Sequence, residues 1–217
     1  LYLLDGNPVY HVNHLLGFFS AFNPDAIKNT RFYKGSFPAE YGGRLSSVVD
    51  VRMNDGNRQE YHGNISVGLL SARANLEGPI VKDRSSFNVS VRRTWLDLIT
   101  GTALAIVNKN SDTKESFGYH FFDINAKVNH SFSERSRAYL SFYMGQDAFR
   151  QGSKEKHEDS DDMFLWRWGN LIGSAGWNYV FGQKLFGNLM VGYSRFRSHI
   201  RQLSLIHISE PTRHLRI

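Results

Sequence analysis

The 217-residue sequence contains no cysteine, only 5 prolines and no long hydrophobic run. Without cysteine the chain has no disulfide framework, and its low proline content excludes a collagen-like or proline-rich chain. No apolar stretch reaches the roughly 18 residues that a transmembrane helix needs. These absences do not exclude a membrane β-barrel, because barrel strands alternate apolar with polar residues and average to a moderate hydropathy.

Charge of one sign is not concentrated anywhere in the chain, although its net charge is +6. The closest basic neighbours are Arg92 with Arg93 and Lys154 with Lys156, and acidic residues follow the second pair. A nucleic-acid-binding face gathers lysine and arginine in one stripe with aromatic residues between them. We therefore expect no nucleic-acid partner.

We expect the C-terminal residues to have a separate origin. Residues 203–213 read LSLIHISEPTR and resemble the translation of a transposon-based sequencing adapter. We therefore expect residues 203–217 to be an artefact and the natural sequence to stop near Gln202. His207 and His214 receive no role as metal ligands for the same reason.

The sequence changes character near residue 56. Before it, short apolar runs are separated by turn residues such as Asp5-Gly6-Asn7-Pro8, and Asn23-Pro24-Asp25 has the cap and first-turn residues of a helix. A short helix is expected over residues 15–22 and a strand over residues 47–53. This mixture predicts a small α/β segment.

Beyond residue 56, long segments alternate apolar and polar residues. In residues 122–129 every even position is apolar and every odd position is polar. Such a period of two predicts strands with one apolar and one polar face. Seven strands are expected, at residues 58–69, 71–79, 86–95, 118–131, 137–147, 164–181 and 186–200. The first two could also form one bent strand.

The predicted connections and aromatic residues favour a barrel wall. Tight polar turns alternate with long connections of about 20 and about 15 residues, as in outer-membrane barrels. Strands of about 10 to 15 residues exceed the five or six that are usual in a soluble β-sandwich, where the aromatics would form the core. The residues expected in aromatic girdles near the strand ends are Tyr61, Trp95, Tyr119, Phe121, Phe122, Phe132, Trp166, Trp168, Tyr179, Phe181 and Phe186.

Four stretches carry a family resemblance: Leu4-Asp5-Gly6, NPDAIKNTRFYKG at residues 23–35, PAEYGGRLSSVVDV at residues 38–51 and ARANLEGP at residues 72–79. The first three resemble the second half of the plug domain of TonB-dependent outer-membrane receptors, in particular those of Bacteroidota. The fourth resembles an early barrel strand of that family. The resemblance implies a mostly β fold, with the C-terminal half of a small α/β plug at residues 1–56. Residues 57–202 would be the N-terminal part of a transmembrane antiparallel β-barrel, about seven of its 22 strands.

The resemblance also implies a function. Receptors of this family bind a scarce substrate at the extracellular face of the outer membrane, and a TonB-type energy-transducing protein moves the plug to admit it. The segment gripped by that partner precedes the plug, so we expect it, and the rest of the barrel, to lie outside this sequence. The resemblance implies contact with outer-membrane lipid, no enzymatic activity and no cofactor, and it leaves open whether the cargo is a siderophore, cobalamin, a glycan or a peptide.

The plug-like stretch supplies candidate contacts with the barrel wall. Its glycines would allow close turns in a crowded lumen, and its charges could pair with the polar wall or remain solvated. The candidates are Arg31, Lys34, Gly35, Glu40, Tyr41, Gly42, Gly43 and Arg44. The polar wall positions are Asn88, Ser90, Arg92, Asp123, Asn125 and Lys127.

Other candidate chemistry is sparse. The acidic run His157, Glu158, Asp159, Asp161 and Asp162 lacks the spacing of an EF-hand loop and is expected to be an exposed loop without metal. No catalytic triad, phosphate loop or zinc spacing is present. Residues 98–107 are apolar and could form a packed helix or a substrate-contacting lid. Two other functions stay open: a plug-less outer-membrane barrel, such as an adhesin or porin, and a secreted β-sandwich that binds glycans.

Overall fold

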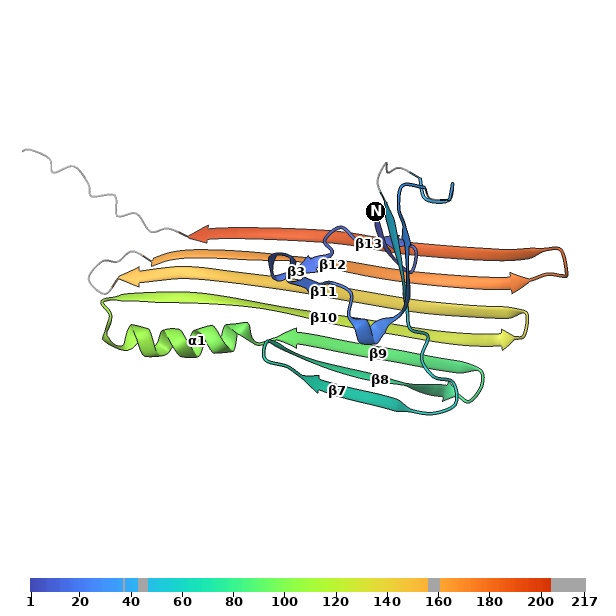
Figure 1. Ribbon diagram of the computed structural model, residues 1–217, viewed down its shortest axis with the longest axis horizontal. Coiled ribbons are helices and arrows are strands. Elements are labelled where there is room, and N and C mark those ends of the chain that lie inside the picture. The colour runs from blue at the N-terminus through green and yellow to red at the C-terminus, as the bar shows by residue number, and fades with distance from the viewer. Residues whose placement is uncertain (37, 43–46, 156–160, 204–217) are drawn as a thin grey trace, which may run out of the picture.

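A computed structural model describes the chain except residues 37, 43–46, 156–160 and 204–217. Its largest element is a seven-stranded sheet in the order β13-β12-β11-β10-β9-β8-β7. Residues 1–56, called here the N-terminal segment, lie across one face of this sheet (Figure 1). The fold is therefore mostly β.

Each strand of the large sheet pairs antiparallel with the next strand in sequence. The strands are β7 (His62–Val67), β8 (Ser71–Val81), β9 (Ser85–Thr94), β10 (Thr113–Ser133), β11 (Ser136–Glu155), β12 (Asp161–Val180) and β13 (Phe186–Leu203). The seven predicted strands are confirmed, and β7 and β8 form a hairpin, not one bent strand. Strands β10 to β13 are longer than predicted, at 18 to 21 residues. Tight turns join β8 to β9, β10 to β11 and β12 to β13 at one end of the sheet (Figure 1).

The two faces of the sheet have opposite chemistry, and the polar face is the buried one. Every odd residue of β10 from 119 to 129 is buried, whereas the even residues between them are not. Asp123 is 0% and Lys127 5% exposed, but Phe142 and Leu140 on the other face are 41% and 64% exposed. A soluble antiparallel sheet does the reverse, with its apolar face packed on a core and its polar face solvated.

The N-terminal segment folds into small sheets and single helical turns. A four-stranded sheet has the order β2-β1-β6-β5, in which β1 and β6 run parallel. Its other elements are a two-stranded sheet and two 3₁₀ turns. The bounds are β1 (Tyr2–Leu4), β2 (Asn7–Pro8), β3 (Asn13–His14), η1 (Leu15–Gly17), β4 (Phe19–Ser20), η2 (Pro24–Ala26), β5 (Ile27–Tyr33) and β6 (Val48–Met53).

The local sequence explains two of these turns, and one prediction for this segment is wrong. Asp5 and Gly6 both have positive φ, as the tight turn of the β1–β2 hairpin requires. The Asn23 side chain accepts a hydrogen bond from the Asp25 amide and caps η2, as predicted. The helix predicted over residues 15–22 is wrong. Gly17, at φ 109°, ends η1 after one turn, and Phe19 then packs against the large sheet.

The apolar run after β9 forms helix α1 (Leu96–Val107), followed by η3 (Asn108–Asn110). It lies beside the part of β10 that extends past the end of β9, where Thr100 Oγ1 donates to the Phe117 carbonyl at 3.1 Å. The predicted helix is confirmed, but no residue of α1 is buried, and Ile106 is 73% exposed. Among the described residues, no helix is long and apolar enough to cross a membrane.

The girdle prediction is partly wrong. Phe132 and Phe181 are exposed near the short turns, as expected of a girdle. Phe186 is exposed as well, but its pairing with Val180 of β12 places it on the polar face. Tyr119, Phe121 and Trp168 instead face the polar side of the sheet, where they form a buried cluster under the N-terminal segment. Position near a strand end does not reveal the face of a residue; only its parity along the strand does.

The exposed apolar face leads us to predict low solubility for the sheet alone. Residues 57–202 expressed without the N-terminal segment should aggregate in detergent-free buffer, because β7 and β13 are open edges and the apolar face would meet water. Analytical ultracentrifugation with and without a non-ionic detergent measures this. A soluble monomer with a cooperative thermal transition would contradict the exposed arrangement.

Candidate functional site: the interface between the N-terminal segment and the sheet

The polar face of the large sheet is covered by residues 1–56, and charged side chains hold its centre together. Lys127 of β10 donates to the Met53 carbonyl at 3.0 Å and lies 3.3 Å from Asp5 and 3.1 Å from Asp55. Arg137 of β11 reaches the other oxygen of Asp55 at 2.9 Å. Two cations of the seven-stranded sheet, called here the wall, therefore pair with two carboxylates of the N-terminal segment.

The electrostatic surroundings of Asp55 lower its pKa. Burial by itself would raise the pKa of this carboxyl, because it penalises the charged form. The hydrogen bond from Lys28, at 2.7 Å, and the charges of Lys127 and Arg137 outweigh burial and hold the pKa well below its usual range. Asp55 therefore stays ionised and keeps its pairs over the ordinary pH range.

A second ionic group lies nearer the end of the sheet opposite the tight turns, called here the long-loop end because the long connection from β9 to β10 lies there. Arg92 of β9 bonds Asp123 at 2.7 Å and donates to the Ser20 carbonyl at 2.7 Å. The His14 imidazole has Nδ1 2.7 Å from Asp147 and Nε2 3.8 Å from Asp123. These contacts connect β3 and β4 of the N-terminal segment to three strands of the wall.

Aromatic rings complete this second group. The His14 ring stacks on Phe121 with centroids 4.1 Å apart and planes at 5°. The Tyr119 hydroxyl donates to Asp147 and accepts from the Leu15 amide at 2.5 Å. Because these groups are buried, breaking one pair would leave the other member without water or partner, which costs more than the pair gains.

Neutral hydrogen bonds extend the interface along β12 and β9. The Asn170 side chain donates to the His11 carbonyl at 2.6 Å and accepts from its amide at 3.4 Å. Asn7 donates to Ser174, and Asn23 donates to Ser90 at 2.7 Å. The wall residues are short, so the backbone of the N-terminal segment can approach the sheet closely.

Glycine and apolar residues fill the remaining space. A Cβ on Gly192 of β13 would collide with the Asn7 side chain, so any larger residue here would require Asn7 to move. Leu4, Val51 and Met53 form a buried cluster with Tyr143 and Ile172 of the wall. The interface is thus a polar seal around a small apolar centre.

The predicted wall positions are confirmed as the covered face. All six are buried: Asn88, Ser90, Arg92, Asp123, Asn125 and Lys127.

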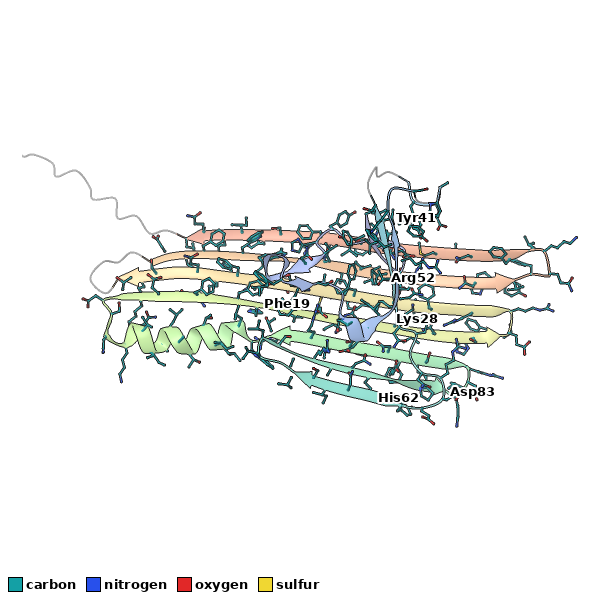
Figure 2. All side chains as sticks on the ribbon, in the orientation of Figure 1. Phe19, Lys28, Tyr41, Arg52, His62 and Asp83 are labelled. Carbon is teal, nitrogen blue, oxygen red and sulfur yellow. The ribbon has the colours of Figure 1, made fainter. Side chains whose placement is uncertain are left out.

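The predicted contacts from the N-terminal segment lie elsewhere. Arg31, Lys34, Gly35, Glu40 and Gly42 are exposed. Arg31 lies on β5, and the other four lie between β5 and β6, as does Tyr41, which is labelled in Figure 2. Gly43 and Arg44 lie outside the described residues.

Tyr41 is held within the N-terminal segment itself. It donates to Asp50 at 3.4 Å, and burial together with that carboxylate raises its pKa. Within the described part of the chain, none of the predicted N-terminal residues bonds one of the seven strands. Their contact with a wall therefore stays a prediction.

Sequence reasoning missed the residues that do form the seal on the N-terminal side, namely Asp5, Asn7, His14, Asn23 and Asp55. The parity of β11 could have placed Asp147 on the polar face, since Ser141 and Tyr143 share it. Nothing in the local sequence marks His14, because its partners Asp123 and Asp147 are more than 100 positions away.

Metal-binding chemistry is not evident in the described residues, where no three His, Asp or Glu side chains gather to hold an ion. His157, Glu158 and Asp159 of the predicted acidic loop lie outside those residues. Asp162, at the start of β12, is exposed.

Beyond the seal, toward the long-loop end, the same face of the sheet carries an aromatic row. Phe149 packs edge-on against Phe117 at 5.5 Å and Phe164 at 6.1 Å between centroids. Trp166 lies 4.2 Å from Trp168 and donates to Ser198 at 2.9 Å. This row borders the seal, because Phe149 and Trp166 pack against the buried Tyr119 cluster.

The lowered pKa of Asp55 predicts a pH dependence. A depressed folded pKa contributes stability that is fully present above the unfolded value of about 3.9 and is lost as the pH falls through the folded value. In urea titrations between pH 3 and pH 7, the natural chain should have a higher free energy of unfolding than Asp55→Asn. The difference should be constant above about pH 5 and should shrink below about pH 4. Asp83→Asn, in the exposed turn after β8, should show no such change. An advantage of the natural chain over Asp55→Asn that does not vary with pH would contradict the pairing.

Comparisons with known proteins give one structural likeness. No family model matches the chain, and no curated protein matches it. Among solved structures, the chain is similar to the siderophore receptor PirA from Acinetobacter baumannii, at 14% sequence identity and a TM-score of 0.43. The match covers 92% of this chain and 40% of the receptor chain, so this chain spans less than half of that receptor.

Proposed function

We propose that this chain is part of an outer-membrane uptake receptor. In this proposal residues 57–202 are about seven strands of the barrel wall, and residues 1–56 are the second half of a plug that closes the lumen. One observation carries the proposal: the N-terminal segment seals the polar face of the sheet while the apolar face stays exposed. This is the arrangement of a wall with lipid outside and a filled lumen inside.

The dimensions of the apolar face agree with a bilayer. On β10 it runs from Phe122 to Phe132, interrupted by His130, and Val128 and Leu140 lie opposite each other within it. The ten steps from Phe122 to Phe132, at about 3.3 Å each, span roughly 33 Å along the strand, and a tilt of about 40° projects this to roughly 25 Å. That is the height of the lipid-facing band of an outer-membrane barrel.

The polar seal suits a plug that must move and return. Its hydrogen bonds and ion pairs can be exchanged for bonds to water when the plug shifts, which a continuous apolar seam could not do at similar cost. A scarce substrate arriving from the long-loop side would meet the aromatic row of Phe117, Phe149, Phe164 and Trp166 before the plug. A TonB-type partner would then supply the force that displaces the plug.

The alternatives explain less of the structure. A plug-less adhesin or porin gives no reason for the ion pairs of Asp5 and Asp55 with Lys127. A secreted β-sandwich would bury Val89 and Phe142 between two sheets. Both side chains are instead about two-fifths exposed.

A reversible cross-link tests the plug without knowledge of the substrate. In the complete receptor, Asn23→Cys with Ser90→Cys would join η2 to β9, where the natural side chains are 2.7 Å apart. In planar bilayers the oxidised receptor should stay closed to KCl in moderate urea. The reduced receptor should open, because urea releases a plug held only by non-covalent contacts.

The matched control is Asn64→Cys with Asn75→Cys, which joins β7 to β8 within the wall. Its oxidised form should open in urea like the natural receptor. A receptor that conducts KCl before any urea is added would favour the porin, and equal opening of the oxidised Asn23–Ser90 pair would exclude residues 1–56 as the plug.

Lipid contact is tested by placing a charge in the apolar face. Phe142→Arg should destabilise the complete receptor by about 2 to 4 kcal/mol in a refolding assay in lipid vesicles, because position 142 lies near the middle of the band. Met163→Arg, on the same face but close to the long-loop end, should cost about 1 kcal/mol or less. Equal penalties at the two positions would contradict a bilayer around this face.

A further inference from the structure

A basic groove lies on the outer face of the sheet, away from the N-terminal segment. It has a volume of about 350 Å³ and is lined by Arg167 of β12 and by Arg195, Arg197 and His199 of β13. Directly opposite residues share a face, so the pairing of Arg167 with His199 and of Leu171 with Arg195 puts these side chains on the apolar side. Gly169, opposite Arg197, leaves the space between them open.

The cations of this groove lack the partners that cations have on the polar face. Within the described residues no carboxylate is in ion-pair distance of Arg167, Arg195 or Arg197, whereas Arg92 and Lys127 are each paired. Arg167 and Arg197 are exposed, and Arg195 is half-buried.

Two more arginines extend the positive charge toward the long-loop end. Arg150 and Arg201 flank Leu165 in the pairing rows of β11, β12 and β13, so they share the outer face. Like charges held this close repel one another unless an anion lies between them.

The groove overlaps the last rows of the apolar band, at its end farther from the short turns. The row of Leu171 contains Met144 and Ile124 on one side and Arg195 on the other. The next row toward the short turns, that of Gly173, contains Tyr193. A molecule bound here would therefore touch arginines at one end and apolar side chains at the other.

We propose that this groove binds the phosphate headgroup of a membrane lipid whose acyl chains lie along the apolar band. The inference rests on the proposed function, because it requires this face to contact a bilayer. Guanidinium groups suit the role, since they stay charged and bind phosphate oxygens in a bidentate manner. Cations at the edge of an apolar band lie at the depth of the lipid headgroups.

Three probes distinguish binding of the whole lipid from binding of its acyl chains or its phosphate alone. The complete receptor in non-ionic detergent is titrated with phosphatidic acid, with diacylglycerol of the same acyl chains and with inorganic phosphate, and bound ligand is counted by native mass spectrometry. Phosphatidic acid should bind at least tenfold more tightly than either of the others. The Arg167→Gln, Arg195→Gln, Arg197→Gln variant should lose at least tenfold of that affinity.

The matched control removes three cations at the opposite end of the strands, as Lys82→Gln, Arg84→Gln and Lys184→Gln, and should bind phosphatidic acid like the natural receptor. Equal affinity of the arginine variant and the natural receptor would overturn the inference, as would equal loss in the control. Diacylglycerol or inorganic phosphate binding as tightly as phosphatidic acid would also overturn it. The proposed function would be contradicted by different results: KCl conductance in the absence of urea, or a receptor that does not insert into bilayers.

Discussion

Buried charges on the polar face of the sheet need partners, and the rest of the structure depends on how this need is met. Asp123, Asp147, Arg92 and Lys127 would each be costly in a dry interior if left alone. The N-terminal segment supplies a carbonyl, a carboxylate or an imidazole to all four of them. The fold of residues 1–56 and the buried charges of the wall therefore depend on each other.

The same constraint explains why the chain has two kinds of sequence. Residues 1–56 must present groups at irregular heights above the sheet, so they use short strands, single helical turns and positive φ at Asp5, Gly6 and Gly17. The wall repeats one pattern along regular strands, and in β10 buried residues alternate strictly with less buried ones from Tyr119 to Asn129. The short polar residues Ser90 and Ser174, with Gly192, mark where the two parts come closest.

Sequence patterns predicted the wall far better than the seal. Alternation in residues 122–129 predicted both faces of β10, because the period of a strand depends on local geometry alone. Asn23 as a cap and Asp5-Gly6 as a turn were readable for the same reason. The helix over residues 15–22 was wrong because Gly17 takes a positive φ and ends the helical turn. The girdle role of Tyr119 and Phe121 was wrong because their odd positions on β10 put them on the polar face. The pairing of His14 with Asp147 joins distant parts of the chain, so no local pattern could reveal it.

The parallel pairing of β1 with β6 has a mechanical consequence. Strand β1 begins near the start of the chain, whereas β6 continues through Asn54 and Asp55 into the wall-anchored region. A pull on the chain before Tyr2, resisted at Asp55, would act at opposite ends of two parallel strands. The two strands would then slide past each other under shear, and the bonds from Val49 to Leu1 and from Asp5 to Val51 would be loaded together and not broken one at a time. Resistance to force would therefore be high in that direction and low for a pull across the sheet.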